Sequence, residues 1–195
     1  MKYKNNKYLN MKKFKIGVLV GSLRKESFNL KTAKVLMEVA PKSLELELID
    51  IANIPMFNQD LEGTPPEEWT TLREAVKAVD GLIFVTPEYN RSVPAVLKNA
   101  IDVGSRPYGK NVWTEKPGAV ISVSTGNISG FGANHHLRQS LAFVNVPTMA
   151  QPEAYIGGAA DLFDEKGNLK NDSTKKFLTT FMEAFEKWTH TNAKS

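Results

Sequence analysis

The sequence predicts an α/β fold in which a doubly wound, five-stranded parallel sheet has helices on both faces. Two observations lead to this prediction. Short apolar runs alternate along the chain with segments whose apolar residues recur at helical spacing. Two of these runs, GLIFVT at 81–86 and GAVISVS at 118–124, are almost continuously apolar, which is typical of central parallel strands covered on both faces. Five strands alternating with helices indicate a doubly wound sheet.

The first strand and helix form the clearest local pattern. FKIGVLV at 14–20 is an apolar run that ends at Gly21, and a helix with one apolar face is expected over 27–40, where Pro41 ends it. LELELIDI at 44–51 then alternates with a period of two. This period indicates a half-buried strand at or near an edge of the sheet.

Two helices are expected on either side of the strand GLIFVT. A proline-containing loop leads into the first of them, which we expect Thr64 to cap and Pro66 to open. After the strand, a turn at 87–92 leads into a short helix over 94–102, with Ser92 as its expected N-cap.

The C-terminal half repeats the alternation of strand and helix. We expect, in order, an irregular segment at 103–117, the strand at 118–124, a glycine-containing loop at 125–130, a helix over 131–144, a short strand within 146–155, a polar connection at 157–170 and a final helix over 173–189.

The net charge of the chain is carried by its first residues. The formal charge is +4, but residues 1–15 hold six lysines and no acid, and the remainder has 19 basic and 21 acidic residues. We therefore expect a basic N-terminal extension at 1–10 and a single domain at 11–195. Because residues 16–195 have no basic excess, no nucleic-acid partner is expected.

The composition excludes several classes of protein. The chain has no cysteine, which excludes disulfides, thiolate zinc sites and cysteine nucleophiles. No run approaches the ~18 consecutive apolar residues of a membrane span, and residues 1–10 lack the apolar core of a signal peptide. We expect a cytoplasmic protein with no membrane partner.

Three loops are candidates for a binding site. In a doubly wound sheet, ligands bind at the carboxyl ends of the strands. The loops that follow predicted apolar strands at this edge are 21–29, 87–92 and 124–131. They are called here the first, second and third loops.

The first loop, GSLRKESFN, has the properties of a phosphate site. It opens a helix, where free backbone N–H groups and the positive end of the helix dipole converge. Ser22, Ser27 and Asn29 add hydrogen-bonding groups, and Arg24 can pair bidentately with a dianionic phosphate. The loop matches neither the dinucleotide fingerprint nor the P-loop. A solvated turn with a capping serine explains it equally well.

The second and third loops offer surfaces to a planar ligand. Tyr89 has an aromatic face and Asn90 has polar groups, and Pro87 and Pro94 fix the backbone on either side. Gly126 in the third loop allows a ring to approach the backbone closely. The alternatives are a rigid turn with an exposed tyrosine and a flexible loop.

Other candidate chemistry is weaker. His135 and His136 point about 100° apart on a helix and cannot chelate one metal as a pair four residues apart could, so no metal site is expected. Ser124 lacks the G-x-S-x-G pattern of an activated serine, so it is not expected to be a nucleophile.

Two of these motifs resemble a known family. GSLRKESFN at 21–29 together with TPEYNRSVPAVLKNAID at 86–102 closely resembles the NADPH-dependent FMN reductase family, nearest its chromate/quinone reductase branch. A third segment, STGNISGFGANHHLRQSL at 124–141, is a weaker match. The resemblance covers nearly the whole chain after Phe14. It implies a flavodoxin-like sheet with strand order 2-1-3-4-5.

The resemblance also implies a cofactor and the residues that hold it. FMN would be bound, with NADPH or NADH as hydride donor and a quinone, azo compound or chromate as small-molecule electron acceptor. Because the flavin does the chemistry, no side chain is named as catalytic. The implied FMN-binding residues are Ser22, Leu23, Arg24, Ser27, Phe28, Asn29, Pro87, Glu88, Tyr89, Asn90, Ser124, Thr125 and Gly126.

The family forms homodimers and often homotetramers. This chain lacks two of the residues that form one contact between subunits in that family. In the chromate/quinone branch, an arginine and a tyrosine pair across subunits with a glutamate. Gly132 and His135 stand at the first two positions here, and only Glu153 matches. The resemblance therefore implies a homodimer or homotetramer without choosing between them.

A flavodoxin-type electron carrier, without substrate turnover of its own, is the alternative function. It would share the fold and FMN. Such carriers are strongly acidic, which helps them dock on basic partners, whereas residues 16–195 carry a net charge of only −2. Rapid oxidation of NADPH distinguishes the reductase from the carrier.

Overall fold

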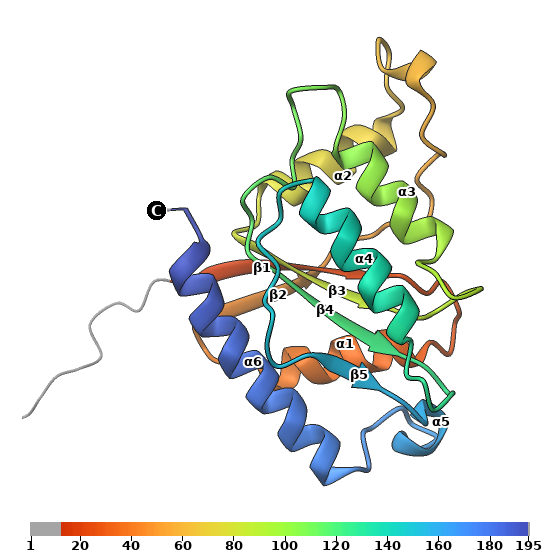
Figure 1. Ribbon diagram of the computed structural model, residues 1–195, viewed down its shortest axis with the longest axis vertical. Coiled ribbons are helices and arrows are strands. Elements are labelled where there is room, and N and C mark those ends of the chain that lie inside the picture. The colour runs from red at the N-terminus through yellow and green to blue at the C-terminus, as the bar shows by residue number, and fades with distance from the viewer. Residues whose placement is uncertain (1–12, 195) are drawn as a thin grey trace, which may run out of the picture.

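The computed structural model describes residues 13–194 and contains a five-stranded, all-parallel sheet in the order β2-β1-β3-β4-β5 (Figure 1). This confirms the predicted fold class and strand order. The expected extension at residues 1–10 lies outside the described residues. The elements are β1 Phe14–Val20, α1 Phe28–Val39, β2 Leu44–Leu48, the 3₁₀ helix η1 Gln59–Leu61, α2 Glu67–Lys77, β3 Gly81–Thr86, α3 Ala95–Gly104, β4 Gly118–Val123, α4 Phe131–Phe143, β5 Ala154–Ile156, α5 Ala159–Leu162 and α6 Asp172–Asn192.

Strand order follows from the apolar patterns. Every residue of β3 and β4 is buried, as expected for central strands covered on both faces. The alternating strand β2 lies at the edge beside β1, with Phe14 opposite Leu44 and Val18 opposite Leu48. Its glutamates point away from the core, and charged side chains on an edge strand oppose pairing with another chain.

The two faces of the sheet are covered by different helices. Alternate residues of β3 belong to different cores, because successive side chains of a strand point to opposite faces. Ile83 packs in the core that includes α1 and α6, whereas Phe84 packs in the core that includes α2, α3 and α4. Figure 1 shows α1 and α6 on one side of the sheet and α2, α3 and α4 on the other.

Two expected helix caps are wrong. Pro66 occupies the N-cap position of α2 without a side-chain cap, and the N–H of Thr64 continues the turn after η1 by donating to Leu61 O at 3.2 Å. Pro94 occupies the N-cap position of α3. The hydroxyl of Ser92 instead lies 3.0 Å from Nδ1 of His136 on α4.

Several boundaries also differ from the expectations. β2 ends at Leu48 rather than at 51, because the Asp50 carboxylate accepts a hydrogen bond from Ala52 N at 2.9 Å and turns the chain. The short helices η1 and α5 were not predicted. β5 reaches Ile156, one residue past the expected segment, and α6 is longer than expected at both ends.

Among the described residues, no helix is long and apolar enough to cross a membrane.

Candidate functional site

The three candidate loops lie together because they follow strands that are neighbours in the sheet. The N–H of Gly21 at the end of β1 donates to Val85 O of β3 at 2.8 Å, and Ser124 N after β4 donates to Ile156 O of β5 at 2.9 Å. A Cβ on Gly21 would approach Pro87 Cδ to 3.2 Å. The first loop therefore packs directly against the second at the carboxyl edge of the sheet.

The first loop has both a capping serine and unused donors. Ser27 is buried, and its Oγ caps α1 by accepting from Leu30 N at 3.2 Å. The capping role proposed as an alternative is thus present. However, the backbone N–H groups of Ser22, Leu23 and Arg24 donate to no group among residues 13–194, and the Arg24 side chain is exposed. These are the groups that an anion at the start of a helix would engage.

The second loop is a tight turn that presents Tyr89. The N–H of Tyr89 donates to Ser92 O at 3.1 Å, and Ser92 N donates to Tyr89 O at 2.9 Å. Asn90 and Arg91 between them have φ of 50° and 63°, the pattern of a type I′ turn. Tyr89 is 48% exposed, so about half of its surface is available for contact with a ligand.

The Glu88 side chain fixes this turn to α4. Its Oε2 accepts from Ala133 N at 3.0 Å, in the first turn of α4, and its Oε1 lies 3.2 Å from Nη1 of Arg91. A carboxylate is stabilised at a helix N-terminus by the free N–H groups and the dipole. Since the carboxylate is engaged and only 11% exposed, the backbone of Glu88 is the part that remains for a ligand.

The third loop is held by the hydroxyls of Ser122 at the end of β4 and of Ser124 within the loop. Ser122 Oγ donates to Ser129 O at 2.7 Å, and Gly126 N donates to Ser124 Oγ at 3.1 Å. Gly130 has φ of 73°, and a Cβ there would lie 2.9 Å from Ser122 Cβ, so this position requires glycine. Thr125 and Gly126 at the tip are exposed and can approach a ring.

Comparison with known proteins decides the family. The sequence matches the model of the NADPH-dependent FMN reductase family over residues 14–161. The chain belongs to the NADPH-dependent FMN reductase family. It is therefore an oxidoreductase with FMN as cofactor and NAD(P)H as electron donor.

Individual relatives of this family member support the same conclusion. A quinone reductase of Pseudomonas putida is 56% identical over 180 residues, covering 92% of this chain and 96% of the relative. A 2-hydroxy-1,4-benzoquinone reductase of Burkholderia sp is 43% identical over 174 residues, covering 89% and 95%. The solved structure of FerB, a flavoenzyme NAD(P)H:(acceptor) oxidoreductase from Paracoccus denitrificans, is 40% identical with a TM-score of 0.87, covering 93% of this chain and all of that one.

A buried asparagine of this FMN reductase family member fits the cofactor. Asn29 in the first turn of α1 is 4% exposed, and its Nδ2 lies 3.5 Å from Val123 O. Its Oδ1 has no hydrogen-bond partner in the described part of the chain. A buried acceptor without a donor costs about 1–3 kcal/mol, and a hydroxyl of the ribityl chain of FMN is a donor of the right kind. The residues present at this edge therefore fit FMN.

Beside the third loop lies a polar network that sequence reasoning missed. Asn134 on α4 donates from Nδ2 to Ala154 O at 3.3 Å and lies 3.4 Å from Ser122 Oγ. Arg138, one turn later, donates from Nε to Asn134 Oδ1 at 2.9 Å and from Nη1 to Met149 O at 2.9 Å. Only the i, i+4 spacing of Asn134 and Arg138 on the predicted helix was a signal for this network.

Burial governs the titration of this network. Burial lowers the pKa of Arg138, and this effect exceeds the opposite effect of the neighbouring Tyr155 and Glu153, which raise the pKa. Burial and then the hydrogen bond and charge of Glu153 raise the pKa of Tyr155 to about 12, while Arg138 acts in the opposite sense. His135 Nε2 lies 3.0 Å from the Tyr155 hydroxyl, so His135, Glu153 and Tyr155 meet within one subunit.

Metal-binding groups are not assembled at this edge. Within residues 13–194, no three His, Asp or Glu side chains are placed to hold a metal ion.

Proposed function

We propose that this chain is an NAD(P)H-dependent, FMN-containing quinone reductase. The observation that carries the proposal is the meeting of three loops at the carboxyl edge of the sheet. The first has an exposed Arg24 at the start of α1 and backbone N–H groups that donate to nothing among residues 13–194, and the second exposes Tyr89. The names of the relatives at 56% and 43% identity favour quinones as acceptors.

We assign the phosphate and ribityl parts of FMN to the first loop. Arg24 and the N–H groups of Ser22 to Arg24 bind the phosphate, and Asn29 Oδ1 accepts from a ribityl hydroxyl. Ser27 contributes through the α1 terminus that it caps, because its Oγ already accepts from Leu30 N. Leu23, 57% exposed, and Phe28, which stacks on Phe163, flank the phosphate end.

We assign the flavin ring to the other two loops. When bound, FMN would supply the redox chemistry between NAD(P)H and the acceptor. Pro87 and the backbone of Glu88 approach one edge of the ring, with Tyr89 and Asn90 at its border. The remaining residues of the set, Ser124, Thr125 and Gly126, approach the opposite edge. The protein's part is to orient the ring, keep one face open and place N–H donors near developing negative charge.

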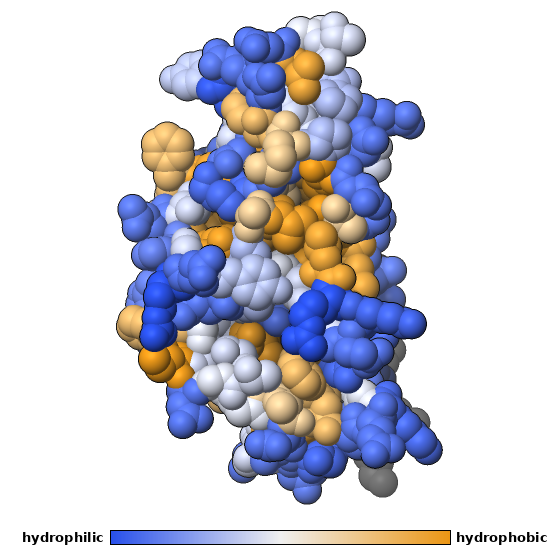
Figure 2. All heavy atoms as spheres, turned by 90° about the vertical axis from the view of Figure 1, so that its right-hand side faces the viewer, coloured by the Kyte–Doolittle hydropathy of each residue, from blue (hydrophilic) through white to orange (hydrophobic). Residues whose placement is uncertain are grey.

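The surface around this edge is suited to apolar ring compounds. Figure 2 shows apolar side chains gathered in the middle of the face of the molecule that includes α3. Exposed apolar residues of the chain include Leu23, Met56 and Ile128. Azo compounds and chromate are further acceptors that the site would admit, since an open site discriminates weakly among acceptors.

We further propose a cytoplasmic homodimer or homotetramer built on a single domain over residues 11–195. A groove of about 600 Å³ lies between α3 and α4, and Phe143 at its border is 91% exposed. A second copy of the chain would bury this aromatic side chain.

The test is an NADPH and NADH oxidation assay of the FMN-loaded protein with benzoquinone as acceptor. Turnover that depends on both FMN and the quinone supports the proposal. A flavin that binds but is reduced by neither nicotinamide identifies an electron carrier instead.

A further inference from the structure

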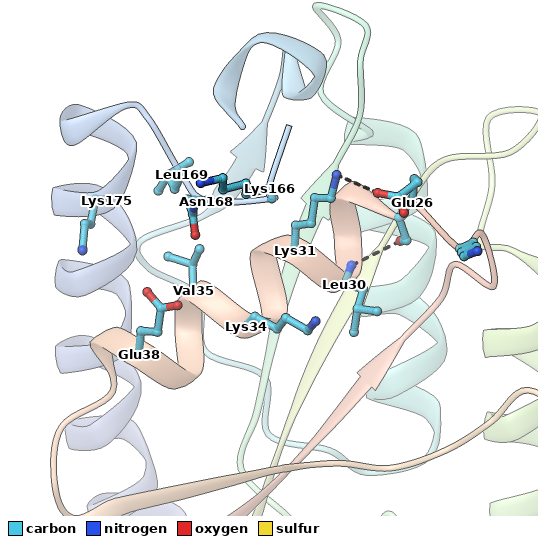
Figure 3. A pocket seen from close by; sticks show the side chains of 13 residues that line it. Glu26, Leu30, Lys31, Lys34, Val35, Glu38, Lys166, Asn168, Leu169 and Lys175 are labelled. Carbon is cyan, nitrogen blue, oxygen red and sulfur yellow. Dashed lines mark hydrogen bonds and ion pairs between the residues drawn. The ribbon is translucent and has the colours of Figure 1, made fainter. Parts of the chain in front are cut away.

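A second concave region begins at the first loop and runs along α1. It is a groove of about 510 Å³ between α1, the connection at 166–169 and the start of α6 (Figure 3). We call it the lysine groove. It is lined in part by Lys25, Lys31, Lys34, Lys166 and Lys175, against two carboxylates, Glu26 and Glu38.

Most of these lysines have no ion-pair partner in the described part of the chain. Lys31 pairs with Glu26 at 3.1 Å. Among residues 13–194, no carboxylate lies within 4.0 Å of the ammonium groups of the other four, which are Lys25, Lys34, Lys166 and Lys175. Several like charges on one groove repel one another, and an anion with more than one negative charge relieves this repulsion.

The lining of the groove is mostly polar, with a few apolar side chains among the lysines. Leu30 and Val35 of α1 and Leu169 of the connection line it, and Figure 3 shows Val35 pointing from α1 toward the connection. A mostly polar groove with several ammonium groups and a few apolar side chains suits a ligand that combines phosphates with a ring whose edges are polar, as a nucleotide does.

The far wall of the groove is a fixed hairpin. Asp164 accepts from Asn168 N at 2.7 Å and from Asn168 Nδ2 at 2.9 Å. Gly167 has φ of 85°, and a Cβ there would lie 3.4 Å from Cε of Lys31. The Lys31 chain therefore packs against the hairpin, while its ammonium lies 5.4 Å from the Phe28 ring centroid. These contacts fix the position of the far wall relative to α1.

The groove is continuous with the site assigned to the FMN phosphate. Lys25, Glu26 and Ser27 line it and belong to the first loop. We propose that the lysine groove accepts the adenylate half of a flavin dinucleotide, so that this chain binds FAD as well as FMN. The inference rests on the proposed function, because it takes the first loop as the phosphate site. The second phosphate meets Lys25 and Lys34, and the adenosine lies against the connection, beside Asn168 and Leu169.

The test compares FMN and FAD binding to protein freed of flavin, by quenching of flavin fluorescence. The variant is Lys34→Gln with Lys166→Gln, which removes two ammonium groups without reversing charge. The control is Lys42→Gln, an exposed lysine before β2. We expect wild-type protein to bind FAD within about tenfold of FMN, and the double variant to weaken FAD about tenfold or more while FMN changes less than about twofold. Lys42→Gln changes neither, and circular dichroism checks the fold of each variant.

Each other outcome overturns the inference in a distinguishable way. Binding of FMN with rejection of FAD overturns it and leaves the proposed function standing. FAD binding that the double variant does not weaken shows that the adenylate lies elsewhere. A third outcome is that the protein rejects FAD, but ADP binds the FMN-loaded protein and the double variant weakens that binding. The groove would then be a nucleotide site separate from the flavin site. Binding of neither flavin overturns the proposed function as well.

Discussion

The Glu88 carboxylate accepts a hydrogen bond from the backbone N–H of Ala133 at 3.0 Å, which joins the second loop to the first turn of α4. The same carboxylate lies 3.2 Å from Nη1 of Arg91 within its own turn. The second loop, which exposes Tyr89, is thus anchored by α4, the helix that follows the third loop. This link makes the second loop and the first turn of α4 one unit.

Replacing Glu88 by alanine is expected to loosen this unit. Loss of a buried charge-assisted hydrogen bond lowers the free energy of unfolding by about 1–3 kcal/mol, and the turn at 89–92 loses its anchor. FMN affinity should fall with it. Denaturant unfolding and flavin titration measure both effects. Glu88→Gln keeps an acceptor for Ala133 N and should lose less; equal losses for both variants would show that charge alone matters.

Gly132→Ala tests the same contact from the helix side. A Cβ on Gly132 would lie 2.9 Å from Arg91 O and 3.0 Å from Glu88 Oε2. Because a backbone oxygen cannot rotate away, we expect the turn to shift and stability to fall by about 1–3 kcal/mol. Gly63→Ala is the matched control, since a Cβ there meets nothing within 4 Å. Identical thermal midpoints for the two variants would contradict this account of the close approach.

Arg24→Ala is expected to weaken FMN binding about 10- to 100-fold, the worth of one charge-assisted pair with a phosphate. Riboflavin lacks the phosphate and is the control ligand, so its affinity should be unchanged. The measurement is a flavin titration of apoprotein with each compound. An unchanged FMN affinity would place the phosphate away from the first loop.

The raised pKa of Tyr155 is expected to make the free energy of unfolding fall at alkaline pH. Its pKa is raised to about 12 from 10.0, first by burial and then by Glu153. A raised pKa favours the protonated hydroxyl in the folded state. The stability that this hydroxyl contributes is therefore complete below pH 10.0 and is lost as the pH rises to about 12. Urea unfolding at several pH values in this window should show a steeper decline for the wild type than for Tyr155→Phe. Parallel declines would mean that other groups control alkaline stability.

The basic extension is expected to be separable from turnover. Deleting residues 1–10 removes three lysines but none of the residues assigned to the three loops. We expect kcat and KM for NADPH and quinone to stay within about twofold, a difference of about 0.4 kcal/mol. A large loss in a steady-state assay would make the extension part of the site or of the oligomer.

Local patterns were sufficient to predict the sheet. The continuous apolar runs of β3 and β4 are buried on both faces, and the alternating run of β2 lies at the edge. Helix ends were predicted less well, because tertiary partners decided them. Ser92 has the right side chain to cap α3, but it closes the turn with Tyr89, while Pro94 takes the cap position.

The candidate site was located by the same logic, since loops after apolar parallel strands meet at one edge. Its internal supports could not be predicted. Glu88 and Ala133 are 45 residues apart, and no local pattern pairs a carboxylate with a distant backbone N–H. The Asn134 and Arg138 network depends on backbone carbonyls of Ala154 and Met149, which any residue could supply. The lysine groove likewise unites segments that are far apart in the sequence.

The most direct test of the central claim is an anaerobic titration of the FMN-loaded protein with NADPH, followed by addition of benzoquinone, with the visible absorption spectrum recorded at each step. The account predicts that NADPH bleaches the flavin in one two-electron step and that the quinone restores its absorbance. A protein that binds no FMN, or whose flavin neither NADPH nor NADH can reduce, would contradict it.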